Sequence, residues 1–100
     1  MPATPLLSST QLANRLATLP LWRLAYGRLL RTVSTRDFRS AVELVTRIAD
    51  QADEQNHHPD VSIHWNEVTL SLWTHASDGL TERDFRLAEA IERMLSESGS

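Results

Sequence analysis

The clearest pattern of hydrophobic and polar positions lies between residues 38 and 52. Apolar side chains recur there at intervals of three and four residues, the spacing that places them on one face of a helix. They are Phe38, Ala41, Val42, Val45, Ile48, Ala49 and Ala52. Ser34 or Thr35 precedes this run as a helix start, and Pro59 disfavours helical backbone at the residue before it. The pattern predicts a long amphipathic helix that ends near Asn56 or His57.

Beyond Pro59 the apolar residues alternate with polar ones, which is typical of half-buried strands. The alternating positions are Val61, Ile63 and Trp65 in one run and Val68, Leu70 and Leu72 in the next. Asn66-Glu67 between them is short enough for a tight connection, so the two runs predict a hairpin. Trp65 continues the alternation and is therefore expected in the core. An earlier hairpin is predicted from Leu21–Tyr26 and Arg28–Val33, with Gly27 as its turn.

Shorter helices are predicted near both ends of the chain. Ser9 or Thr10 can cap the first, which should end before Pro20 and turn Leu12, Leu16 and Ala13 inward. Asp78-Gly79 is a turn signal, and Thr81 followed three residues later by Asp84 resembles a capped helix start. The buried face expected for this last helix is Phe85, Ala88, Ile91 and Leu95.

These elements follow the order α-β-β-α-β-β-α and predict an α+β fold. We expect a four-stranded antiparallel sheet with helices packed on one face. A chain of 100 residues corresponds to one domain. That domain is expected to span residues 9–95, with an N-terminal tail at 1–8 and a C-terminal tail at 96–100.

Composition excludes several classes of function. The chain has no cysteine, so a disulfide framework, a cysteine zinc site and a thiol nucleophile are ruled out. A formal net charge of −3 without a run of Lys or Arg argues against nucleic-acid binding. The apolar stretches are too short to span a bilayer, and the first residues do not resemble a secretory signal. We therefore expect a cytoplasmic protein with no membrane and no nucleic-acid partner.

Histidines are the candidate carriers of chemistry, because an imidazole can donate or accept a proton near neutral pH. His57 and His58 lie where the long helix gives way to the second hairpin, and His75 follows the last strand. The start of one strand of an antiparallel hairpin lies beside the end of its partner, so these histidines should meet in space. His64, the fourth histidine, lies within a strand and is expected to face solvent.

Two carboxylates are candidate partners of these imidazoles. Asp53 precedes His57 by four residues, which on a helix places both on one face. It could orient the imidazole, or it could belong to an ordinary pair on the helix surface. Asp84 fits the acidic position of a helix cap, although capping and a role in the site can coexist.

A metal site is the main alternative use of this histidine cluster. Three histidines and a carboxylate could hold zinc. Adjacent histidines are not a usual ligand spacing, however, and the chain has neither His-x-His nor HExxH. A third interpretation is that the histidines are only surface or capping residues.

The span from Asp53 to Asp84 resembles the signature of the pterin-4a-carbinolamine dehydratases. That signature has an acidic, basic or His residue, three spacers, His-His or His-Asn and Pro. After five spacers comes Trp or Tyr, after nine more His or Trp, and then Asp. The matching positions here are Asp53, His57, His58, Pro59, Trp65, His75 and Asp84. The flanking Asn56, Asp60, Thr74 and Gly79-Leu80-Thr81 are also similar to the family, and the resemblance extends over about Ser9 to Leu95.

The resemblance implies an enzyme, a hydro-lyase that removes water from a 4a-hydroxytetrahydropterin to give a quinonoid dihydropterin and so recycles a tetrahydrobiopterin-type cofactor. It implies no metal and no cofactor of the enzyme's own. His58 and His75 would be the main acid and base, in an order left open, and His57 would assist or hold the pterin. The residues that would bind or flank the substrate are Asp53, Asn56, Pro59, Trp73, Thr74, Ala76, Arg83 and Asp84. Trp65 could help to wall the pocket.

The resemblance also implies self-association, since family members form dimers and dimers of dimers. We expect a homodimer or homotetramer whose active site is complete within each subunit. Some animal members act as dimerisation cofactors of a transcription factor, so a non-catalytic interaction protein of the same fold is the alternative function.

Overall fold

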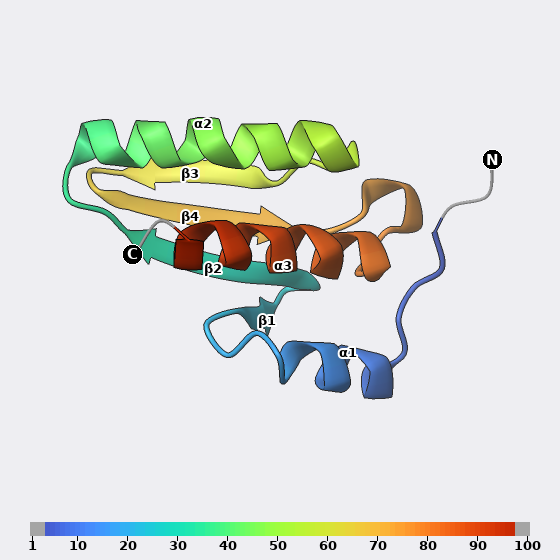
Figure 1. Cartoon of the computed structure of the whole chain (residues 1–100). Helices are drawn as coiled ribbons and strands as arrows, with labels where there is room; N and C mark the ends of the chain where they lie inside the picture. The colour runs from blue at the N-terminus through green and yellow to red at the C-terminus, as the bar shows by residue number, and fades with distance from the viewer. Residues whose placement is uncertain (1–3, 98–100) are drawn as a thin grey trace.

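The computed structural model describes residues 4–97 and confirms the predicted order of elements (Figure 1). Its elements are α1 (Ser9–Leu16), β1 (Arg23–Ala25), β2 (Arg28–Ser34), α2 (Phe38–Gln55), β3 (Asp60–His64), β4 (Glu67–Leu72), the short 3₁₀ turn η1 (His75–Ser77) and α3 (Glu82–Glu97). The fold is the expected α+β arrangement of a four-stranded antiparallel sheet and three helices.

The strands lie in the order β1-β2-β4-β3. The second hairpin therefore joins the first through pairing of β4 with β2. Figure 1 shows α2 and α3 running along the sheet, and the two helices are in contact. Alternate residues of β4 (Val68, Leu70 and Leu72) are fully buried against Ile48, Phe85 and Ile91 of the helical layer. Each such aliphatic side chain contributes about 1.5–3 kcal/mol to stability when buried. Because Asp60 pairs with Ser71, the start of β3 lies beside the end of β4.

The buried face of α2 is offset from the predicted stripe. Ala41, Leu44, Ile48 and Ala52 are buried, whereas Phe38 remains 52% exposed and Val42 42% exposed. The apolar stripe is wider than the surface that the sheet and α3 cover. The predicted start is also corrected, because Asp37 caps α2 and accepts the Ser40 N–H at 2.8 Å. The hydrogen bonds from Ser40 hold the pKa of Asp37 below its usual range. This contribution to stability is therefore present at neutral pH and lost as pH falls through the folded-state pKa.

Both hairpins close through two-residue turns, with left-handed backbone at Tyr26 and Gly27 in the first and at Trp65 in the second. Tyr26 and Gly27 have φ of 55° and 72°. The prediction of Gly27 as a turn residue is confirmed, but β1 spans only Arg23–Ala25, so the predicted strand Leu21–Tyr26 is too long at both ends and Tyr26 belongs to the turn. The second turn consists of Trp65 and Asn66, one residue earlier than predicted, because β3 ends at His64. Trp65 therefore leaves the strand alternation, with φ of 56° and 63% exposure, and the predictions that it belongs to the core or walls the pocket are wrong.

Parts of the predicted tails are ordered by contacts. Leu6 forms a β-bridge with Thr81, and Ser8 rather than Ser9 or Thr10 caps α1, in a capping box with Gln11. Leu12 and Leu16 pack against the core as predicted, but Ala13 is exposed. At the other end α3 continues to Glu97. Residues 1–3 and 98–100 of the predicted tails lie outside the described residues, and the domain limits stay a prediction. Within residues 4–97 no helix is long and apolar enough to cross a membrane.

Candidate active site

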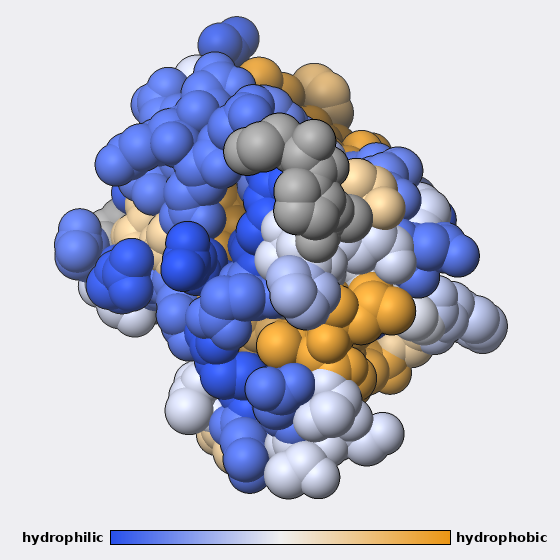
Figure 2. All heavy atoms as spheres, turned by 90° about the vertical axis from the view of Figure 1, so that its right-hand side faces the viewer, coloured by the Kyte–Doolittle hydropathy of each residue, from blue (hydrophilic) through white to orange (hydrophobic). Residues whose placement is uncertain are grey.

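The end of α2, the start of β3 and the segment after β4 line an open cavity of about 370 Å³. Its lining residues are Asn56, His57, His58, Pro59, Asp60, Trp73, Thr74, His75, Ala76 and Arg83. The prediction that His57 and His58 meet His75 is thus confirmed. Figure 2 looks at the end of the molecule where α2 ends and α3 begins; hydrophilic side chains cover the left and upper part of this face, and a hydrophobic patch lies to the right, below the centre. A larger cavity of about 440 Å³ lies near the start of α2 and the end of α3, but no histidine lines it.

The two adjacent histidines diverge because α2 ends abruptly. Asn56 adopts left-handed backbone with φ of 51°, and the His57 N–H donates to the Ala52 carbonyl at 3.0 Å. This is a common way to terminate a helix, and Asn tolerates the conformation better than most residues. His57 is consequently turned out of helical register with Asp53. The predicted pairing of these two residues is wrong.

His57 pairs instead with Asp84 from the start of α3. The His57 Nε2 lies 2.6 Å from Asp84 Oδ1, and both side chains are buried. The second Asp84 oxygen accepts the Thr74 hydroxyl at 2.9 Å and the Thr81 N–H at 2.9 Å. These bonds satisfy a buried carboxylate that would otherwise be costly to remove from water. Asp84 therefore caps α3 and fixes the His57 imidazole, so that its two possible roles coexist.

His58 and His75 are exposed, unlike His57. The His58 Nε2 lies 3.0 Å from Asp53 Oδ1, so Asp53 is the partner of the second histidine rather than the first. The His75 ring lies against Trp73, with ring centroids 4.0 Å apart and planes tilted by 41°. The site thus holds one buried, immobilised imidazole and two that can exchange protons with solvent.

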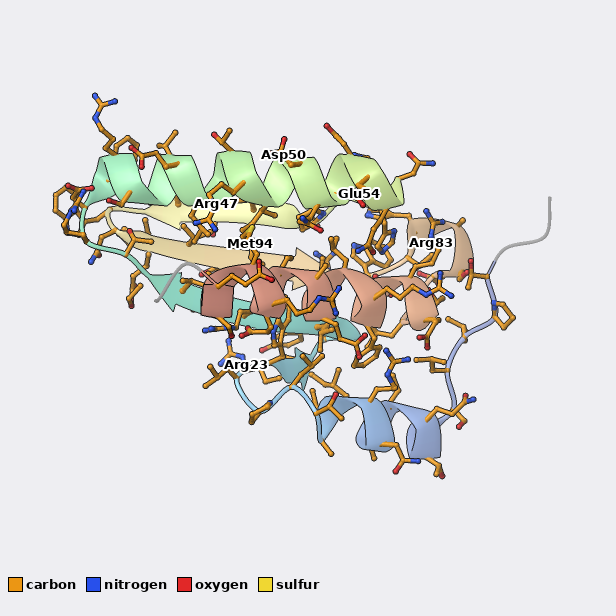
Figure 3. All side chains as sticks on the ribbon, in the orientation of Figure 1. Arg23, Arg47, Asp50, Glu54, Arg83 and Met94 are labelled. Atoms are coloured by element: carbon orange, nitrogen blue, oxygen red, sulfur yellow. The ribbon has the colours of Figure 1, made fainter. Side chains whose placement is uncertain are left out.

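Most of the predicted substrate-binding residues line the cavity: Asn56, Pro59, Trp73, Thr74, Ala76 and Arg83. Arg83 projects from the start of α3 (Figure 3), and its guanidinium donates to the Asn56 carbonyl at 2.6 Å. Asp53 and Asp84 do not line the cavity but contact its histidines. Asp60 also lines the cavity and pairs with Arg28, but neither residue is among the predicted site residues, and Asp60 is named above only as part of the family resemblance. Asp60 follows Pro59 directly and could have been proposed from position, whereas no sequence signal connects Arg28 to the site.

The fourth histidine serves as an internal control. His64 is exposed at the end of β3 that leads into the Trp65–Asn66 turn, and it does not line the histidine cavity. We expect His64→Ala to leave the catalytic activity of the protein at the wild-type rate and to change stability by about 0.5 kcal/mol or less, as at ordinary surface sites. Activity and thermal melting of the purified variant check this. A large loss of turnover would show that the active site lies on a different part of the sheet.

The residues present do not suggest a metal centre. Across residues 4–97 no group of three or more His, Cys, Asp and Glu side chains is arranged to hold a metal ion. Two of the histidines are instead engaged by separate carboxylates. The arrangement is suited to general acid and base chemistry, in which imidazoles transfer protons to and from a ligand in the cavity.

Comparison with known proteins identifies the family of this chain. The sequence profile of the family described as Pterin 4 alpha carbinolamine dehydratase matches residues 5–94. Relatives named "Putative pterin-4-alpha-carbinolamine dehydratase" include one from Mycolicibacterium smegmatis, 44% identical over 91% of this chain and 97% of its own. One from Herpetosiphon aurantiacus is 42% identical over 91% of this chain and 95% of its own.

A solved structure has the same fold. The transcriptional coactivator/pterin dehydratase from Brucella melitensis superposes with a TM-score of 0.84 and 25% sequence identity, covering 90% of this chain and 98% of its own. Together with the profile match over most of the sequence, this similarity shows that the chain belongs to the pterin 4 alpha carbinolamine dehydratase family.

Proposed function

We propose that this protein is a hydro-lyase that converts 4a-hydroxytetrahydropterin to quinonoid dihydropterin and water, and so recycles a tetrahydrobiopterin-type cofactor in the cytoplasm. The observation that carries the proposal is the cavity lined by His57, His58 and His75, in a chain of this family. A stopped-flow assay with freshly generated 4a-hydroxytetrahydropterin tests it.

The reaction requires two proton transfers at neighbouring atoms. A general acid protonates the hydroxyl at C4a, whose C–O bond breaks to release water. A general base removes the proton from the adjacent ring nitrogen, and the electron pair of that N–H bond is left to form the new C=N bond. No electrons are gained or lost overall, so imidazoles in the neutral and protonated forms can supply both steps.

The three histidines fit different parts of this reaction. We assign proton transfer to His58 and His75, because both are exposed and line the cavity. His57 is held by the buried Asp84, so it suits orientation of the pterin or assistance to the other two. The backbone of Asn56 and of Trp73 to Ala76 would hold the flat edge of the pterin, with Arg83 at the mouth of the pocket.

Activity should not depend on a divalent metal. The two proposed proton transfers need no Lewis acid. The Nε2 atoms of His57 and His58 are each hydrogen-bonded to a carboxylate. Protein treated with EDTA and dialysed is therefore expected to keep its full dehydration rate. Elemental analysis of the same samples provides the control. Stoichiometric zinc whose removal abolishes activity would contradict the assignment.

We further propose that the protein forms a symmetric homodimer or homotetramer. Two features support self-association: the exposed Phe38 and Val42 on α2, and the edge strands β1 and β3 of the open sheet. Light scattering is expected to give a mass at least twice the 11.3 kDa of the chain, and Val42→Glu should weaken the association. A monodisperse monomer at high protein concentration would refute the proposal without affecting the catalytic one.

The alternative function is a non-catalytic interaction partner of the coactivator type. The name of the Brucella melitensis structure includes this role, and the same exposed face of α2 could carry it. The two functions separate experimentally. Two results together would favour the alternative. The wild-type protein would show no dehydratase activity, and the His58→Ala/His75→Ala variant would still bind its protein partner.

A further inference from the structure

The side chain of Trp73 connects the candidate site to the sheet. On one side, its ring centroid lies 4.0 Å from that of His75. It also lies 4.7 Å from the central carbon of the Arg28 guanidinium, which is placed over the indole ring. Contacts of both kinds are favourable for an aromatic ring, and a cation is attracted to the electron-rich face of an indole. Trp73 is therefore in contact with one residue of the cavity and one residue of β2.

Arg28 is itself fixed by neighbours on the adjoining strands. Its Nη1 lies 3.1 Å from the Asp60 carboxylate at the start of β3 and 3.5 Å from the Ser71 hydroxyl near the end of β4. The guanidinium thus extends from β2 across β4 to β3. A side chain held in this way limits the movement of the indole against which it packs.

The three histidines of the cavity differ in what orients them. His57 is hydrogen-bonded to Asp84, and His58 is hydrogen-bonded to Asp53. No side-chain hydrogen bond fixes the His75 imidazole in the part of the chain that the structure describes, and its ring contact is with Trp73. A carboxylate orients each of the first two imidazoles, and the indole is the group placed to orient the third.

Burial of the Trp73 indole leaves one polar atom without a hydrogen-bond partner. Its Nε1–H is the one buried side-chain nitrogen or oxygen without a hydrogen-bond partner among residues 4–97. An unsatisfied buried donor is unfavourable and calls for an explanation in terms of what the group does. The contacts that hold Trp73 are therefore those of its ring, with the hydrophobic core, Arg28 and His75, and not a hydrogen bond of its polar atom.

We propose that Trp73 is a positioning residue, whose indole, held by Arg28, keeps the His75 imidazole in the orientation that proton transfer requires. This proposal rests on the proposed catalytic role of His75. Small displacements of a catalytic group can lower a rate by as much as about 10²-fold, so the geometry of this contact matters to turnover.

Steady-state and single-turnover kinetics of three variants test the proposal. Trp73→Leu removes the aromatic face, and kcat is expected to fall roughly tenfold or more while KM changes little. Trp73→Phe keeps an aromatic face and should restore most of kcat. Trp65→Leu is the matched control, because Trp65 is exposed in the β3–β4 turn and does not line the cavity, and it should behave as wild type. Wild-type kcat in Trp73→Leu, or equal losses in the Leu and Phe variants, would overturn the positioning role.

The His75→Ala variant distinguishes this proposal from the one on which it rests. Full activity in His75→Ala would remove the catalytic role of His75, whatever Trp73 does. Loss of activity in His75→Ala with wild-type kcat in Trp73→Leu would leave that role intact and overturn only the positioning by Trp73.

Nuclear magnetic resonance supplies a readout that a general loss of stability would not reproduce. The ring current of an indole in contact with His75 should shift the carbon-bound protons of that imidazole upfield in the wild type. The shift should disappear in Trp73→Leu and persist in Trp65→Leu. Should Trp73→Leu fail to fold, Arg28→Gln provides the second test, with an expected loss of part of the shift and part of kcat. Unchanged His75 resonances and unchanged kcat in Arg28→Gln would contradict the proposal.

Discussion

Replacing His58 or His75 by alanine is expected to lower the rate of carbinolamine dehydration by roughly 10²-fold or more in each case, since a positioned general acid or base typically contributes 10²- to 10⁴-fold. Both side chains are exposed, so the folded structure should survive either change. Stopped-flow measurement of water loss from the carbinolamine provides the rate, and circular dichroism confirms the fold of each variant.

The double variant separates a cooperating pair from two independent residues. Groups that act in the same step lose less in combination than the product of their single effects, because removal of one already disables the step. We expect this behaviour for His58→Ala/His75→Ala, with His64→Ala as the matched control. A double variant with the wild-type rate would refute the assignment of the two histidines.

Asp84→Ala is expected to have the largest effect on stability. The carboxylate is fully buried and accepts hydrogen bonds from His57, Thr74 and Thr81. Each buried donor left without a partner costs about 1–3 kcal/mol, so the free energy of unfolding should fall by roughly 3 kcal/mol or more. For a domain of this size such a loss corresponds to a decrease in Tm of more than about 10 °C. Activity should fall as well, because His57 loses the group that fixes its ring.

Asp53→Ala is the matched control for this change. Its side chain is 76% exposed and contacts only the exposed His58 in the described hydrogen bonds. Its effect on the unfolding free energy should stay within about 0.5 kcal/mol. Thermal or denaturant unfolding of both variants provides the comparison. Equal stability of Asp84→Ala and Asp53→Ala would contradict the importance given to the buried hydrogen bonds.

The fold could be predicted from sequence because its determinants are local. The alternation through Val68, Leu70 and Leu72 identified a strand whose apolar side is buried, and the interval pattern from Ala41 to Ala52 identified the long helix. Hairpin geometry was sufficient to bring His75 beside His57 and His58, since antiparallel pairing fixes which strand ends are neighbours.

The errors arise where a conformation or a distant partner decides the outcome. The spacing of Asp53 and His57 predicts a pair only if the helix continues, and Asn56 ends it with left-handed backbone. The partner of His57 is Asp84, 27 residues away in sequence. Contact between the end of α2 and the start of α3 depends on packing of the whole domain, which no periodicity encodes.

The hydrophobic pattern also could not predict which apolar residues remain exposed. Phe38 and Val42 satisfy the helical interval as well as Ala41 does, yet the area of the sheet and α3 limits how much of α2 can be covered. Trp65 continues the strand alternation but occupies a turn, because the pairing of His64 with Glu67 already closes the hairpin. Such outcomes depend on the size of the neighbouring surfaces and on strand register.

The most direct test of the proposed function is a stopped-flow measurement with 4a-hydroxytetrahydropterin that is generated immediately before mixing with the protein. Wild-type protein is expected to accelerate formation of the quinonoid dihydropterin in proportion to its concentration, with and without EDTA, and the His58→Ala/His75→Ala variant should do so far more slowly. A dehydration rate with wild-type protein equal to that in buffer alone would contradict the proposed function.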